Sequence, residues 1–135
     1  MSSDPGPIPV EVLHLVLFCR AWDACVGFYR DTMGFPEVDA REGFLEVEAA
    51  PAARIGLIRV PRSSRREAGA GPFLVSLRVT DIDRTHRLLS ERLPGLEPVR
   101  AHPWGADLFE IRDPEGRRLE FWSPRKGWPE GGPAG

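Results

Sequence analysis

Apolar and polar residues alternate along several short segments of the chain, and two other segments carry apolar residues at helical spacing. Glu11 to Phe18 alternates with a period of two, which predicts a strand. Ala21 to Thr32 has helical spacing, and the nearby Gly34 is a residue type that commonly ends helices. Three further short strands are predicted after it, at Glu37 to Ala40, Phe44 to Glu48 and Arg54 to Val60.

The second half of the chain repeats this order of elements. Phe73 to Val79 reads as a strand, and Asp81 is suited to cap the N-terminus of a helix over Ile82 to Arg92. The residues from Asp113 to Gly116 form a tight turn between the last two strands. The three closing strands are predicted at Glu97 to Ala101, Asp107 to Arg112 and Arg118 to Trp122.

Short stretches of the two halves also match in sequence. GFPEV at residues 34–38 parallels GLEPV at 95–99, FLEV at 44–47 parallels LFEI at 108–111, and RIGLI at 54–58 parallels RLEFW at 118–122. Three matches in the same order argue that a strand–helix–three-strand unit has been duplicated.

Length and composition fit one domain over residues 1–135. The chain is 41% hydrophobic, which provides enough apolar material for a core. We expect module one at about residues 10–60, a polar linker at 61–72, module two at about 73–123, and a flexible tail at 124–135.

Charge and cysteine content exclude several classes of protein. The formal net charge of -2 gives no reason to expect nucleic acid or an anionic membrane as a partner. No apolar run approaches the roughly 18 residues that span a bilayer, and the N-terminus lacks the pattern of a signal peptide, so we expect a soluble, cytoplasmic protein. Cys19 and Cys25 are too few for a disulfide scaffold and are predicted to be reduced.

The ordered motifs resemble those of the vicinal oxygen chelate superfamily, which includes glyoxalases, bleomycin resistance proteins and extradiol dioxygenases. The motifs are HLVLFCRAWDACVGFYRDTMGF (residues 14–35), VTDID (79–83), PWG (103–105) and DPEGRRLEF (113–121). The resemblance covers about residues 10–124 and implies an α+β fold. In that fold two βαβββ modules form a cupped eight-stranded mixed sheet, with helices on the convex side and a ligand cavity on the concave side. The fold alone does not choose among the family's functions.

Metal ligands in this superfamily come from four strands, and the resemblance places them at His14, Gly56, Leu74 and Glu120. Gly56 and Leu74 have no side chain that can bind a metal. A catalytic ion needs about three protein ligands, which Glu46, Glu110 or His102 would have to complete. We therefore expect no cofactor, and a divalent metal held by His14 and Glu120 is the alternative.

Strand alternation predicts which other side chains face the cup. Aromatic walls with a few polar groups suit a planar ligand. The candidate ligand-binding residues are His14, Phe18, Phe44, Arg78, His102, Trp104, Glu110, Glu120 and Trp122.

Three functions remain open. The preferred hypothesis is a metal-independent small-molecule-binding protein that resembles bleomycin resistance proteins and sequesters an aromatic natural product or drug, conferring antibiotic resistance. Such relatives are dimers, so we expect a homodimer. The alternative is a lyase, isomerase or oxygenase whose catalytic residues are His14 and Glu120, acting with a metal or as an acid/base pair. The third is an inert partner subunit. The two residues also have structural interpretations: His14 bonded to a neighbour, and Glu120 paired with Arg78 or Arg54.

Overall fold

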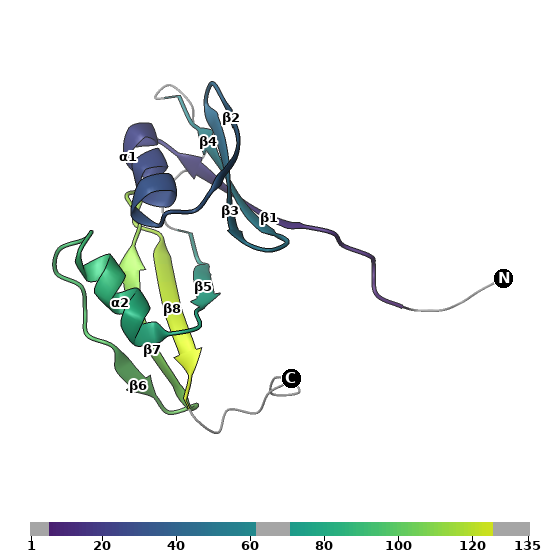
Figure 1. The fold of residues 1–135 in the computed structure, drawn as a ribbon. Helices are drawn as coiled ribbons and strands as arrows, with labels where there is room; N and C mark the ends of the chain where they lie inside the picture. Colours follow the sequence, from purple (N-terminus) through teal and green to yellow (C-terminus); the bar gives the residue numbers. More distant parts are fainter. Residues whose placement is uncertain (1–5, 62–70, 126–135) are drawn as a thin grey trace.

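The computed structural model describes residues 6–61 and 71–125, which form two modules with the same order of elements (Figure 1). The first module consists of β1 (Leu13–Cys19), α1 (Trp22–Val26), the π-helix η1 (Gly27–Thr32), β2 (Glu37–Arg41), β3 (Phe44–Ala50) and β4 (Ala53–Arg59). The second consists of β5 (Leu74–Arg78), α2 (Ile82–Ser90), β6 (Arg100–His102), β7 (Ala106–Arg112) and β8 (Arg118–Pro124). None of the helices in these ranges is long and apolar enough to cross a bilayer.

Each module builds a four-stranded mixed sheet with the same strand order. The orders are β1-β4-β3-β2 and β5-β8-β7-β6. The first and last strands of each module pair in parallel, and the other pairs are antiparallel. The α+β fold of two βαβββ modules is thus confirmed. Its eight strands are divided between two hydrogen-bonded sheets instead of forming one continuous sheet.

The strand registers confirm the duplication residue by residue. In the first sheet Gly56 lies between Val16 and Glu46. In the second sheet Glu120 lies between Ser76 and Glu110. Gly56 and Glu120 therefore occupy equivalent positions, as the matched sequence stretches predicted.

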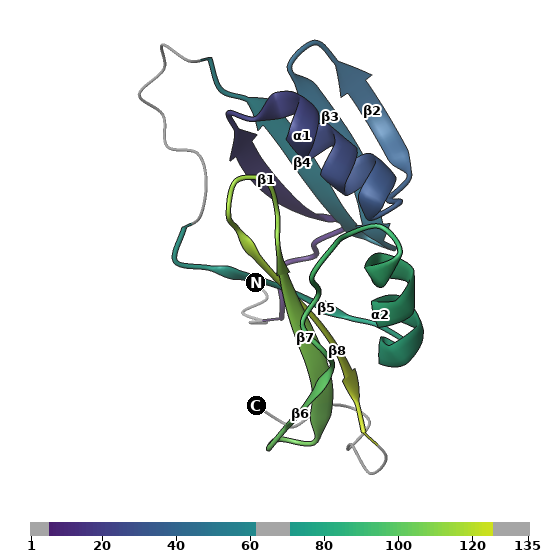
Figure 2. The same ribbon diagram turned by 90° about the vertical axis from the view of Figure 1, so that its left-hand side faces the viewer.

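Both helices lie on the same side of the molecule, in front of the strands in Figure 2. In keeping with strand alternation, Leu17, Leu57, Leu119 and Phe121 are buried on the helix side, whereas Leu13 at the start of β1 is 68% exposed. These side chains belong to one apolar cluster that draws residues from both modules. The opposite faces of the sheets carry no helix and hold the candidate site residues of β1 and β8.

Several predicted boundaries are wrong by a few residues. β6 begins at Arg100 instead of Glu97. Pro98 has no N–H to donate to a strand ladder, and the Glu97 carbonyl instead lies 2.7 Å from His86 Nε2. β8 continues to Pro124, and Arg125 N donates to the Gly105 carbonyl at 2.7 Å. Most of the predicted linker, at 62–70, and most of the predicted tail, at 126–135, lie outside the described residues.

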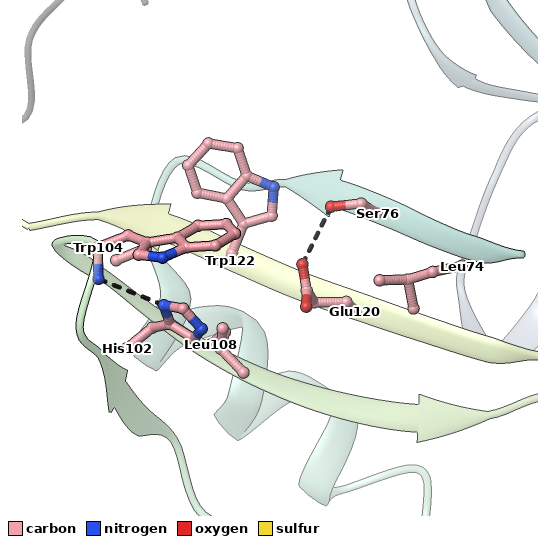
Figure 3. Close-up of a pocket in the computed structure, with 8 residues that line it drawn as sticks. Leu74, Ser76, His102, Trp104, Leu108, Glu120 and Trp122 are labelled. Atoms are coloured by element: carbon pink, nitrogen blue, oxygen red, sulfur yellow. Dashed lines mark hydrogen bonds between the residues drawn. The ribbon is translucent and has the colours of Figure 1, made fainter. Parts of the chain in front are cut away.

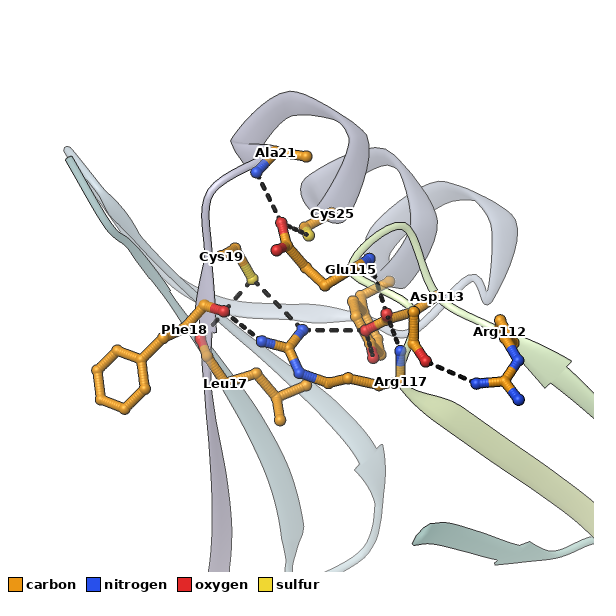
Figure 4. A network of polar contacts seen from close by, with 11 residues as sticks. Leu17, Phe18, Cys19, Ala21, Cys25, Arg112, Asp113, Glu115 and Arg117 are labelled. Carbon is orange, nitrogen blue, oxygen red and sulfur yellow. Dashed lines mark hydrogen bonds and ion pairs between the residues drawn. The ribbon is translucent and has the colours of Figure 1, made fainter. Parts of the chain in front are cut away.

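A buried ion pair in the β7–β8 turn joins the two modules (Figure 4). The side chains of Asp113 and Arg117 are 0% and 3% exposed, and Arg117 Nη1 donates to Asp113 Oδ2 at 3.0 Å. Tyr29 of the first module donates its hydroxyl to the same oxygen at 2.7 Å. Arg117 Nη2 donates across the junction to the carbonyl of Phe18. The turn predicted only to reverse the chain therefore also connects the modules.

The two cysteines lie beside this ion pair. Both are free and buried. Arg117 Nη1 lies 3.9 Å from Cys19 Sγ. A hydrogen bond with Cys25 lowers the pKa of the Cys19 thiol, and the charge of Arg117 contributes to this effect. The same hydrogen bond raises the pKa of Cys25, as does burial, so the Cys25 thiol stays protonated.

Candidate functional site

A pocket of about 520 Å³ opens on the helix-free face of the second sheet (Figure 3). This volume is in the range of sites that bind drug-sized molecules. The described residues that line it all come from module two: Leu74, Ser76, His102, Trp104, Ala106, Leu108, Glu120 and Trp122. The pocket therefore uses all four strands of one sheet.

Two tryptophans form one wall of this pocket. Trp122 stands on β8, directly opposite Leu108 of β7. Trp104 lies in the turn between β6 and β7 and is 80% exposed. The β alternation points Trp122 to the pocket side because its neighbours Phe121 and Ser123 face the other way. The two indoles offer apolar ring surface to a ligand (Figure 3).

The His102 ring packs against the Trp104 ring. The two ring centroids are 4.6 Å apart in an edge-to-face arrangement. The backbone N–H of Trp104 donates to His102 Nδ1 at 3.3 Å, so the accepting Nδ1 carries no proton.

Glu120 places a carboxylate at the base of the pocket. It lies on β8 two residues before Trp122, on the same face of the sheet. Ser76 Oγ of the neighbouring β5 donates to Glu120 Oε1 at 3.1 Å. The expected pairing with Arg54 is wrong, because Arg54 Nη1 bonds Glu46 Oε2 at 2.9 Å in the other sheet. Arg78, the other expected partner, has its guanidinium 5.5 Å from the centre of the Trp122 ring.

Glu110 faces the same side of the sheet but is not among the residues that line the pocket. Arg118 holds both of its oxygens, with Nε–Oε1 at 3.0 Å and Nη2–Oε2 at 2.9 Å. The hydrogen bond from Arg118 lowers the pKa of the Glu110 carboxyl. Its negative charge is thus neutralised within the protein.

Four further candidate residues lie away from this pocket. His14 and Phe18 belong to β1 and Phe44 to β3, all in the first sheet. His14 Nδ1 lies 3.9 Å from Glu46 Oε1 on β3, which is too long for the hydrogen bond of the structural interpretation. Arg78 lines a separate hollow at the end of β5. His14 and Glu120 belong to different four-stranded sheets.

In the first sheet the position equivalent to Glu120 is occupied by Gly56, which has no side chain. Gly56 is buried, and a Cβ atom there would lie 3.5 Å from Cε1 of Phe44. A side chain longer than alanine at this position would have to displace the Phe44 ring. In the first module the Phe44 ring therefore packs over Gly56.

The residues present do not fit a catalytic metal. Of the four positions implied by the family, Gly56 and Leu74 offer no donor atom. Glu46 and Glu110, which could have completed a site, are each held by an arginine. Within the ranges that the structure describes, no group of three or more His, Cys, Asp or Glu residues is placed to hold an ion.

Four lining residues were not among the sequence candidates: Leu74, Ser76, Ala106 and Leu108. Leu74 and Ser76 could have been found by alternation, since both are on the cup face of β5. Leu108 is 5% exposed although it lines the pocket, and an apolar residue of this kind cannot be told from a core residue in sequence. Leu108 lines the pocket because it lies directly opposite Trp122.

Residues 11–121 match the model of the Glyoxalase/Bleomycin resistance protein/Dioxygenase superfamily. The match covers most of the chain, and the chain therefore belongs to this superfamily. No curated protein matches it closely enough to suggest a more specific identity.

Several solved structures share the fold. A glyoxalase/bleomycin resistance protein/dioxygenase from Nocardioides is 22% identical with a TM-score of 0.71, over 100% of this chain and 93% of that chain. Lactoylglutathione lyase from Agrobacterium tumefaciens is 22% identical with a TM-score of 0.69, over 86% and 95%. TnmS3, an antibiotic binding protein from a Streptomyces species, is 21% identical with a TM-score of 0.67, over 88% and 99%. At these identities the likeness shows the fold alone.

Proposed function

We propose that this protein binds a planar aromatic small molecule, a natural product or drug, without a metal. By sequestering this molecule, the protein protects the organism against it. The observation that carries the proposal is the pocket with Trp104 and Trp122 on one wall and a single carboxylate at its base. Aromatic rings bury large apolar areas against each other and gain further energy from stacking. An antibiotic binding protein among the structures with this fold is consistent with the proposal.

The exposure of Trp104 supports a binding role over a structural one. A tryptophan that is 80% exposed contributes little to the core of the free protein. Its indole would gain most of its hydrophobic stabilisation when a ligand covers it. Trp122 is already partly buried, so it can hold its position while Trp104 closes on the ligand.

The proposal predicts that planar aromatic compounds raise the melting temperature and quench tryptophan fluorescence. A ligand that binds only the native state stabilises it by mass action. Trp104→Ala and Trp122→Ala should each weaken the affinity for such a compound roughly tenfold, because truncating an aromatic contact typically costs at least 1 kcal/mol. Calorimetric titration measures the affinities.

Trp22→Phe is the matched control for this experiment. Trp22 begins α1 on the helix side, and it packs against the core instead of the pocket. This variant should bind as the wild type does. Equal losses in all three variants, or no thermal stabilisation by any compound of a broad aromatic panel, would contradict the proposal.

We further propose that two copies of the chain associate as a homodimer. Apolar side chains are exposed along the segment that leads into β1, with Ile8 81%, Val10 72% and Leu13 68% exposed. This segment projects away from both modules in Figure 1. A run of exposed apolar residues is typical of a surface that packs against another chain.

A further inference from the structure

The described residues that line the pocket carry one formal negative charge and no positive one. Glu120 is the acidic residue among its described lining residues, and neither arginine nor lysine is present among them. His102, the other titratable residue of the lining, accepts a hydrogen bond at Nδ1 that requires that nitrogen to be unprotonated. The electrostatic character of the pocket is therefore set by Glu120.

The arginines around the pocket are engaged elsewhere. Arg118, next to Glu120 in sequence, holds both oxygens of Glu110. Arg125 donates to the His102 carbonyl at 2.9 Å and to Asp107 Oδ1 at 3.2 Å. Arg78 lies over the Trp122 ring. None of these arginines is among the described residues that line the pocket.

Among the described residues, Ser76 is the hydrogen-bond partner of Glu120, and the charge of Arg118 also acts on this carboxylate. Ser76 Oγ donates to Oε1 at 3.1 Å, and no donor among residues 6–61 and 71–125 bonds to Oε2. A neutral aromatic ligand that filled the pocket would cover this oxygen with apolar surface and remove its water. Covering a carboxylate without a compensating donor is unfavourable.

We propose that the natural ligand carries a cationic nitrogen, a protonated amine or an amidinium, that bonds to Glu120 Oε2 while the aromatic part of the ligand stacks on Trp104 and Trp122. This inference rests on the proposed function and specifies the chemical class of its ligand. A charge-assisted hydrogen bond to a carboxylate is about twice as strong as a neutral one. The indole faces also attract a cation. Both interactions favour a positive ligand over a neutral one of the same shape.

Three acridines of similar shape and different charge test the inference. At mildly alkaline pH, 9-aminoacridine is a cation, acridine is neutral and acridine-9-carboxylate is an anion. Calorimetric titration of the wild-type protein should give an affinity about tenfold higher for the cation than for neutral acridine, with the anion weakest of the three. Glu120→Gln should reduce the preference for the cation to about twofold or less.

Glu42→Gln is the matched control, since it removes the same formal charge from an exposed turn of the first module. The Glu42 side chain is 90% exposed, and this variant should keep the full preference for the cation. The comparison of ligands on the wild-type protein does not depend on the folding of either variant.

The outcomes separate the two proposals. Equal affinity for the cation and neutral acridine, or tighter binding of the anion, overturns the cationic class but leaves aromatic binding intact. A preference that persists in Glu120→Gln overturns the role of Glu120. If no acridine binds the wild-type protein, the proposed aromatic binding fails and the inference that rests on it fails with it.

Discussion

Glu46 and Glu110 occupy equivalent positions in the two modules, and each is held by the arginine eight residues later in the chain. The Arg54–Glu46 and Arg118–Glu110 contacts are both 2.9 Å long. The same interaction has therefore been kept in both halves after duplication. It leaves Glu120, which has no counterpart in the first module, as the carboxylate of the pocket.

The contact with Arg118 predicts a lowered pKa for the Glu110 carboxyl. Because the hydrogen bond from Arg118 lowers the pKa of Glu110 below the ordinary value of 4.5, the pair stabilises the fold above that pH. This contribution is lost as the pH falls through the lowered pKa. NMR titration of the carboxyl carbon should show the low pKa, and Arg118→Gln should raise it towards 4.5.

Arg112→Gln is the control for this titration. Arg112 acts on Glu110 through its charge alone, so its removal should raise the pKa less than removal of Arg118 does. A larger change in Arg112→Gln than in Arg118→Gln would show that the hydrogen bond is not the main cause.

At the scale of elements, alternation and duplication predict the strands and their faces well. The faces of β1 and β8 follow from the alternation of apolar and polar residues. The matched stretches predict that Gly56 and Glu120 occupy equivalent positions in the two modules. Side-chain partners could not be predicted in the same way, because long arginine side chains reach several carboxylates on a sheet. The partners of Glu46, Glu110 and Glu120 depend on strand register, which only the folded sheet shows.

The β7–β8 turn gives a prediction about stability. Arg117→Met would leave Asp113 buried without its cation, which typically costs about 3–5 kcal/mol. The free energy of unfolding, measured with urea, should fall by an amount of this order. Arg100→Met is the matched control: its pair with Glu97 is more than half exposed, and the loss should be below about 1 kcal/mol.

Equal losses in the Arg117 and Arg100 variants would show that burial does not distinguish the two pairs. A small loss in Arg117→Met alone would mean that Tyr29 and backbone N–H groups are enough to stabilise the Asp113 carboxylate.

At the scale of the molecule, the sequence predicts two similar modules but not that the side chains of one sheet line the pocket of about 520 Å³. The surroundings of the last strand differ between the sheets: the Phe44 ring packs over Gly56 in the first module, and Glu120 lines a pocket in the second. The relative placement of the modules could not be predicted either, because it rests on buried contacts of Arg117 and Asp113 that look like ordinary turn residues.

The homodimer proposal gives a prediction at the same scale. Size-exclusion chromatography with light scattering should give about twice the chain mass of 15.0 kDa at micromolar concentration. Leu13→Glu should convert the dimer to the monomer, because it places a charge among apolar side chains at the interface. A wild-type protein that elutes as a monomer would contradict the proposal, and Glu42→Gln, in an exposed turn, should leave the mass unchanged.

The unequal modules have a consequence for how the protein can change over evolutionary time. In the first module Phe44 closes the space over Gly56, so substitutions there act mainly through packing. In the second module the equivalent space is open, and substitutions at Trp104 or Leu108 reshape a cavity while the buried junction holds the sheet in place. The first module can thus keep the scaffold unchanged while substitutions in the second module alter which ligand binds.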